Sequence, residues 1–280
     1  MTTQDIDYLH HGDRAMTLSL TSPAGDGPFP AVIDLHGGGW GKGSRSECLQ
    51  RDAVLAEAGI AAVALDFRDG ADGYRSSLID INYAVRWLKA HARDFQIDPE
   101  RIGINGQSSG GHLAMLAAMR PNDPRYASLE LGDAPEIDAS VRCVGMFWPV
   151  INPLSRYRRV VRLRAGDDTP AWVADLPERH DQYWVTEDAM AEGNPMLALE
   201  RGEAVETPPA LWVQGQPDPV HDYRDPDAPV ELNEPERFVA NYRNAGGDID
   251  ITYIEQETRS SNTSAAPLAA FFQKHLLSTG

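Results

Sequence analysis

Apolar residues gather in short runs along the chain, and most of these runs are followed by a segment with helical spacing. Runs of five to ten residues bounded by Gly, Pro or polar clusters predict buried or half-buried strands. They lie at residues 15–21, 31–35, 60–65, 101–105, 141–150, 209–214 and 248–255. A regular succession of such strands is typical of a sheet that runs through the whole chain.

Between these runs, apolar residues recur three and four positions apart, as they do on one face of a helix. The clearest example is residues 77–92, where Leu78, Ile81 and Val85 share a face. Further helices are predicted up to about residue 58 and at residues 112–119, 234–244 and 266–277. Because strands alternate with helices, right-handed crossovers should build a mostly parallel twisted sheet flanked by helices, which is the α/β class.

Residues 152–205 interrupt this alternation, since they contain no evident strand and lie between two predicted strands. Their first part, residues 155–164 (SRYRRVVRLR), is strongly basic in an otherwise acidic chain. We predict that residues 152–205 form a helical, cap-like insertion over one end of the sheet. Since one α/β domain can reach roughly 250 residues, we expect residues 1–280 to form a single domain that contains this insertion.

Composition and charge narrow the range of partners. A hydrophobic fraction of 42% supports a sizeable core, and the formal net charge of −17 repels polyanions, which argues against nucleic acid and anionic membranes. Cys48 and Cys143 cannot form a disulfide framework, so we expect free buried thiols. The first residues lack a basic region followed by an apolar run, and no apolar stretch could span a bilayer, so we expect a cytoplasmic location.

One glycine-rich segment carries the strongest chemical signal. Residues 106–110 (GQSSG) follow a predicted strand and open a predicted helix, which is the setting of a nucleophile elbow. The sharp turn would expose the Ser108 hydroxyl at a helix N-terminus, where the helix dipole favours a developing negative charge. The alternative is a glycine-rich turn without a catalytic role.

A second glycine cluster, residues 36–40 (HGGGW), comes directly after the strand at residues 31–35. Consecutive glycines allow backbone amides to face an incoming carbonyl oxygen. The amides of Gly38 and Gly39, together with that of Ser109, would then form an oxyanion hole. His36 is more consistent with a structural hydrogen bond than with a catalytic base.

HGGGW followed by GQSSGGHLA resembles the carboxylesterase/lipase branch of the α/β-hydrolase superfamily, nearest to its hormone-sensitive-lipase and feruloyl/acetyl-esterase-like enzymes. Residues 65–68 (LDFR) and 97–102 (IDPERI) add to the likeness, which is strong over residues 30–120 and weak over 209–280. The resemblance implies an α/β-hydrolase fold and a Ser–acid–His triad. It also implies that Asp218, in a G-x-x-D segment after a late strand, is the acid.

The histidine of that family should follow the last strand, but residues 256–262 (QETRSSN) contain none. Arg259 lies nearest the expected place, and an arginine stays protonated and cannot accept the serine proton. His221, three residues beyond Asp218, is the best substitute base, and His180 in the insertion is an alternative. His112 and His275 fit structural roles better.

The insertion and the glycine loop also suggest substrate contacts. Arg156 and Arg259 could clamp a carboxylate or phosphate, although a solvated helix face paired with acids is the alternative for Arg156. Trp40 is a further candidate substrate contact. Four aromatic residues of the insertion could wall a pocket, although packing within the cap is the alternative for most of them: Tyr157, Trp172, Tyr183 and Trp184. No zinc-ligand spacing or phosphate-binding fingerprint occurs, so we expect a small-molecule substrate, no metal and no cofactor, and leave open whether the chain forms a homodimer.

These features predict a serine-dependent hydrolase with an atypical triad, acting on a carboxylic ester, lactone or amide of a small substrate with anionic or aromatic character. The absent family histidine leaves two alternatives open. One is a lyase, isomerase or decarboxylase-like enzyme that uses Ser108 to bind substrate. The other is a non-catalytic small-molecule binder.

Overall fold

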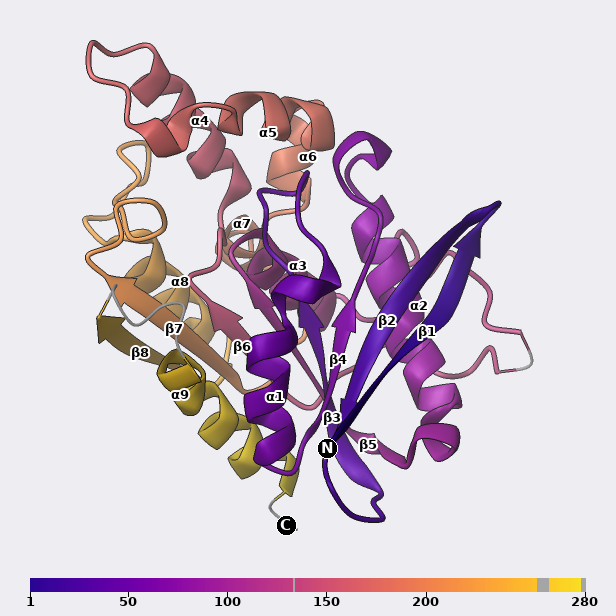
Figure 1. Cartoon of the computed structure of the whole chain (residues 1–280). Coiled ribbons are helices and arrows are strands. Elements are labelled where there is room, and N and C mark those ends of the chain that lie inside the picture. The colour runs from indigo at the N-terminus through magenta and orange to yellow at the C-terminus, as the bar shows by residue number, and fades with distance from the viewer. Residues whose placement is uncertain (133, 256–261, 278–280) are drawn as a thin grey trace.

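The chain folds around an eight-stranded sheet (Figure 1), seen in a computed structural model that describes residues 1–132, 134–255 and 262–277. The spatial order of the strands is β1-β2-β4-β3-β5-β6-β7-β8. Their bounds are β1 Thr2–His11, β2 Arg14–Ser22, β3 Phe29–Leu35, β4 Ala61–Leu65, β5 Ile97–Gln107, β6 Val144–Phe147, β7 Ala210–Gln216 and β8 Ile249–Glu255. In this spatial order, the neighbours from β4 through β3, β5, β6 and β7 to β8 pair in parallel. The pairs β1–β2 and β2–β4 are antiparallel, so the predicted mostly parallel sheet is confirmed.

The central strands β3 and β4 are buried on both faces, which explains why their sequences are continuous apolar runs. The edge strand β1 was not predicted, because its residues are largely exposed and polar and carry no apolar alternation. It is held to β2 by backbone pairing and by the carboxylates of Asp5 and Asp7, which accept hydrogen bonds from Ser19 and Thr17. Charged residues on an edge strand also discourage pairing with other chains.

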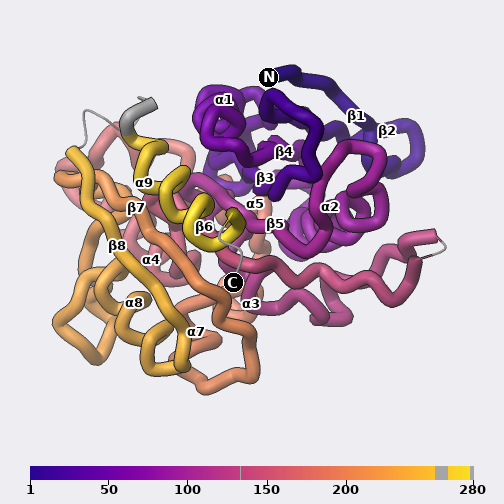
Figure 2. The backbone as a smooth tube through the Cα atoms, turned by 90° about the horizontal axis from the view of Figure 1, so that it is seen from below, coloured from indigo at the N-terminus to yellow at the C-terminus, as the bar shows by residue number. Residues whose placement is uncertain are grey.

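Helices cover both faces of the sheet (Figure 2). Helices α1 (Leu49–Glu57) and α9 (Asn262–Phe272) share an apolar cluster on one face, built around Val32 and Leu268. Helices α2 (Ser76–Ala90), α3 (Ser109–Met119) and α8 (Glu234–Asn244) pack with the larger cluster on the other face. No helix among the described residues is both long and apolar enough to cross a bilayer.

Between β6 and β7 the chain forms α4 (Pro153–Arg164), α5 (Leu176–Trp184), α6 (Glu187–Glu192) and α7 (Pro195–Glu200). In Figure 1, α4, α5 and α6 lie above the end of the sheet where the parallel strands finish. Asn152, Thr186 and Asn194 begin α4, α6 and α7, and each side chain accepts a hydrogen bond from an amide of the first turn. These caps explain how a segment without strands is divided into short helices.

Candidate active site

Ser108 occupies a tight turn between β5 and α3. Its backbone torsions of φ 53° and ψ −116° lie in a region that side-chain-bearing residues rarely adopt, which is typical of strain held at a functional site. A Cβ on Gly106 would lie 2.2 Å from the Gly110 carbonyl oxygen, and one on Gly110 would lie 2.3 Å from the His36 carbonyl oxygen. Only glycine fits at both positions, so the elbow motif is required by the close approach of the chain to itself.

The Ser108 side chain faces a histidine and an aspartate from the loop after β7. Its Oγ lies 3.1 Å from His221 Nε2, and His221 Nδ1 lies 2.9 Å from Asp218 Oδ2. Asp218 and His221 are 3% and 7% exposed. A carboxylate that accepts a hydrogen bond from Nδ1–H keeps Nε2 unprotonated, so that Nε2 can accept a proton from the serine hydroxyl. The structure therefore brings together Ser108, Asp218 and His221.

The Asp218 carboxylate is fixed by bonds from its own loop and from β7. Its Oδ1 accepts the backbone amides of Val220 at 3.0 Å and His221 at 3.2 Å, and its Oδ2 accepts the Gln214 side-chain amide at 3.2 Å. Gln214 is a positioning residue that no sequence motif indicated. Arg259, which we had considered at the family's histidine position, lies outside the described residues.

The glycine loop after β3 lies against the same serine. Gly38 and Gly39 have φ values of +105° and +62°, and both line the cavity in front of Ser108. A Cβ on Gly38 would lie 1.5 Å from the Lys42 carbonyl oxygen, so the tight loop closure requires glycine there. Ser109 is the first residue of α3, so its amide lies in the helical turn that has no intrahelical acceptor. This arrangement fits an oxyanion hole.

Trp40, His112 and Tyr183 belong to a buried aromatic layer beside the site. Trp40 donates its indole N–H to His112 Nδ1 at 3.2 Å, and His112 Nε2 bonds to the Gly193 carbonyl at 2.7 Å. Burial lowers the pKa of His112 to about 4, so this imidazole is neutral and structural. Tyr183 differs from the prediction: it is fully buried, donates its hydroxyl to Ser77 at 3.0 Å and does not line the cavity, because it packs behind Trp40.

The cavity in front of Ser108 has a volume of about 250 Å³. The glycine loop, the elbow and the His221 loop form one side, and α4, α5 and the segment between them form the other. Its lining includes the predicted Trp40, Arg156 and Trp172. It also includes residues that the sequence did not single out, namely Trp148, Val150, Leu176, Arg179 and Val220. No sequence signal marked those residues, because they come from the segment without a recognised motif and from strand ends.

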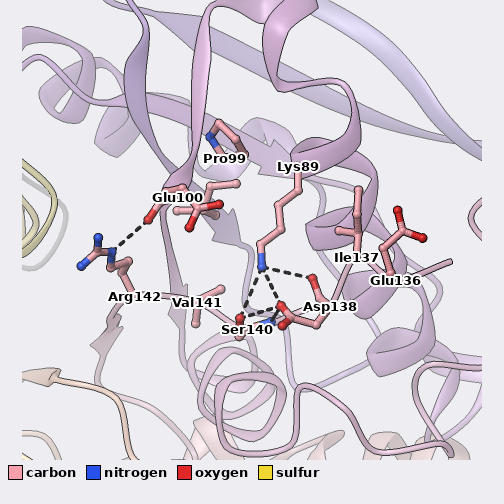
Figure 3. A pocket seen from close by; sticks show the side chains of 10 residues that line it. Lys89, Pro99, Glu100, Glu136, Ile137, Asp138, Ser140, Val141 and Arg142 are labelled. Carbon is pink, nitrogen blue, oxygen red and sulfur yellow. Dashed lines mark hydrogen bonds and ion pairs between the residues drawn. The ribbon is translucent and has the colours of Figure 1, made fainter. Parts of the chain in front are cut away.

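Larger hollows lie elsewhere and lack this chemistry. One of about 530 Å³ is at the opposite end of β5, where Lys89 is bound by Asp138 at 2.8 Å and by Ser140 (Figure 3). Lys89 is already paired with Asp138, and no serine–histidine pair faces this hollow among the residues described. Within the described parts of the chain, no group of three or more His, Cys, Asp or Glu side chains could hold a metal ion.

The sheet order, the strained elbow after β5 and the loop after β7 define an α/β-hydrolase fold with a serine–histidine–aspartate site. The family profile of BD-FAE matches residues 18–155. Thermogutta terrifontis esterase 2, in its sarin-phosphonylated structure, superposes with a TM-score of 0.73 at 20% identity, covering 99% of this chain and 97% of that chain.

Two Mycobacterium tuberculosis proteins are similar to part of the chain. The probable carboxylic ester hydrolase LipM is 37% identical over 137 residues, and esterase LipC is 34% identical over 125 residues. Each match covers 43% of this chain, and the chain spans only 31% and 30% of the length of these relatives. The chain thus has an α/β-hydrolase fold and is similar, over part of its length, to carboxylic ester hydrolases.

Proposed function

We propose that this protein is a serine-dependent carboxylic-ester hydrolase. The observation that carries the proposal is the chain of contacts from Ser108 Oγ to His221 Nε2 and from His221 Nδ1 to Asp218, beside a glycine loop that lines the same cavity. The similarity to LipM and LipC, which are described as an ester hydrolase and an esterase, supports it. Lactones and activated amides undergo the same acyl transfer and are included.

The geometry supports a two-step reaction. Ser108 Oγ attacks the ester carbonyl carbon while His221 Nε2 takes the hydroxyl proton, and the amides of Gly38, Gly39 and Ser109 hold the carbonyl oxygen as it becomes negative. The C–O bond to the alcohol then breaks, and His221 returns the proton to the departing oxygen. In the second step, water attacks the carbonyl carbon of the acyl-enzyme while His221 Nε2 takes its proton. The bond to Ser108 Oγ then breaks, Oγ regains a proton from His221, and the acid is released. Asp218 keeps the imidazole oriented and stabilises its charged form throughout.

The two alternatives lose their main argument. A lyase-like or binding role was attractive because no histidine follows β8 within the expected segment. His221 stands within hydrogen-bond distance of the serine, so a base for acyl transfer is available from another loop. A protein that only bound its ligand would not require both a strained elbow and a histidine–aspartate pair in contact with it.

Covalent labelling tests the proposal directly. A fluorophosphonate probe should label the folded protein at Ser108, identified by peptide mass, and a short-chain p-nitrophenyl ester should show an acyl-enzyme burst. The Ser108→Ala variant is the matched control and should show neither. If the folded wild-type protein takes up no probe and hydrolyses no ester, the proposal is wrong.

A further inference from the structure

Arg156 is a buried cation that faces the Ser108 cavity without a counter-ion. It lies on α4, is 4% exposed, and has no carboxylate within ion-pair distance among the residues that the structure describes. Its Nη1 donates to the Val220 carbonyl, and its guanidinium lies 5.2 Å from the centre of the Trp172 ring. Its Nε is buried and has no acceptor within the described chain. The guanidinium is therefore only partly satisfied.

Four other arginines around it are paired, whereas Arg159 forms no ion pair with a described residue. Arg158, Arg162 and Arg164 lie on the same helix and form ion pairs with Glu187, Asp227 and Glu178. Arg179 also lines the cavity, but it is bound to Asp175 at 2.6 Å. The contrast shows that Arg156 is not simply one member of a solvated basic helix face.

A buried guanidinium without an anion is costly, because a charge removed from water is stabilised only by pairing and hydrogen bonding. Burial lowers the pKa of Arg156 to about 10, which still leaves it protonated at neutral pH. Neighbouring Arg159 donates to the Pro219 carbonyl and lies 4.3 Å from the centre of the Tyr223 ring, and it too lacks an ion pair in the described chain. A ligand that brought an anion to this wall would supply the missing interaction.

A second unsatisfied atom lines the same cavity. His180 Nδ1 bonds to the Leu176 carbonyl at 2.7 Å and must donate its proton there, which leaves Nε2 as an acceptor. Nε2 is buried and has no partner among the described residues. The cavity wall thus contains a cationic donor group and a neutral acceptor, each with a buried nitrogen that has no hydrogen-bond partner among the described residues.

We propose that Arg156 binds a carboxylate carried by the substrate, so that the preferred esters have a free carboxylate in their acyl or alcohol part. His180 Nε2 would accept a hydrogen bond from an O–H or N–H group of the same molecule. This inference rests on the proposed esterase activity and names the substrate class of that site. Arginine suits the role because its planar donors match both carboxylate oxygens at once.

A purely structural role for Arg156 has different consequences. Because Arg156 donates to the carbonyl of Val220, it could serve only to hold the loop that carries His221. Its loss would then lower the turnover of every ester by a similar factor. Carboxylate binding instead requires a loss that is confined to anionic esters and is expressed mainly in KM.

Matched substrates separate these roles and the two parts of the ester. On the alcohol side, 4-acetoxybenzoate is compared with 4-acetoxybenzamide. On the acyl side, the 4-nitrophenyl monoester of adipic acid is compared with 4-nitrophenyl hexanoate, each rate being divided by its hydroxide-catalysed rate. We expect wild-type kcat/KM to favour the anionic member of at least one pair by about 10- to 100-fold, as for a hydrogen bond to a charged group.

The Arg156→Gln variant should abolish this preference, because kcat/KM for the anionic esters should fall about 10-fold or more beyond any loss for the neutral esters. Arg158→Gln, on the exposed face of α4, is the matched control and should keep the preference. Equal losses for anionic and neutral esters in Arg156→Gln, or no preference in the wild type, would overturn the proposal. If Arg156→Gln does not fold, inhibition of the wild-type enzyme provides the test. On the alcohol side, 4-hydroxybenzoate should inhibit and 4-hydroxybenzamide should not. On the acyl side, adipate should inhibit and hexanamide should not. Failure of the esterase proposal is recognised separately, by absent hydrolysis of the neutral esters.

Discussion

Asp218 Oδ2 and His221 Nδ1 are 2.9 Å apart, and only two residues separate Asp218 from His221 in the sequence. Acid and base therefore occupy one short loop after β7, and the loop folds back on itself because Asp218 also accepts the Val220 and His221 amides. The same loop carries His221 Nε2 to 3.1 Å from Ser108 Oγ. If the loop shifts, acid and base move together, which makes its anchoring decisive for activity.

Replacing the base is the sharpest test of this geometry. His221→Gln should lower kcat by about 10²- to 10⁴-fold, because the serine loses the group that accepts its proton. Steady-state hydrolysis of a p-nitrophenyl ester and the rate of fluorophosphonate labelling should fall together. His10→Gln, at an exposed position on β1, is the control and should retain full activity. Unchanged turnover in His221→Gln would show that another group activates Ser108.

The carboxylate beside it should matter through orientation. Asp218→Asn keeps the size of the side chain but can present N–H to His221 Nδ1, which favours the wrong tautomer and removes the stabilising charge. We expect kcat to fall by roughly 10²- to 10⁴-fold with a small change in KM. Asp227→Asn, on the exposed part of the same loop and paired with Arg162, should remain close to wild type. Equal effects of both substitutions would point to loop destabilisation instead.

The glycine loop provides a test of the oxyanion hole. Gly38→Ala places a methyl group against the Lys42 carbonyl and should displace the neighbouring amides, so kcat should fall by about 100-fold or more. Gly12→Ala is the control for alanine at positive φ, since Gly12 has φ +61° and its Cβ would meet no described atom within 4 Å. Both variants should melt at lower temperature, but only Gly38→Ala should lose activity. An active Gly38→Ala enzyme would contradict the assignment.

Buried His180 predicts an acid-dependent stability difference. Burial lowers the pKa of His180 from its usual value of 6.5 to about 3. Below about pH 6.5, His180 therefore binds a proton in the unfolded chain but not in the folded protein. The free energy of unfolding consequently falls as the pH drops from 6.5 towards 3. His180→Phe removes this contribution, and its free energy of unfolding relative to wild type should rise by about 2 kcal/mol between pH 7.5 and pH 5. Denaturant titrations at the two pH values measure the change, and a pH-independent difference would refute it.

Local sequence determined much of the fold and the position of the nucleophile. The apolar runs marked seven strands because parallel strands are buried on both faces, whereas exposed β1 left no such pattern. The spacing of glycines around Ser108 identified the elbow because the turn leaves no room for a Cβ at Gly106 or Gly110. Features that depend on one turn of backbone can be predicted from the residues of that turn.

Only the tertiary structure decided which side chains meet across the cavity. His221 was one of several candidate histidines until the loop after β7 placed it at Ser108, and Tyr183, a reasonable wall residue by sequence, proved to be packed behind Trp40. Arg156 could equally have faced solvent, as Arg158 on the same helix does. Sequence by itself indicated the elbow, the glycine loop and the succession of strands and helices from β2 onward, because each is a local demand on the backbone. Their partners depend on how segments far apart in the chain pack, which no local pattern records.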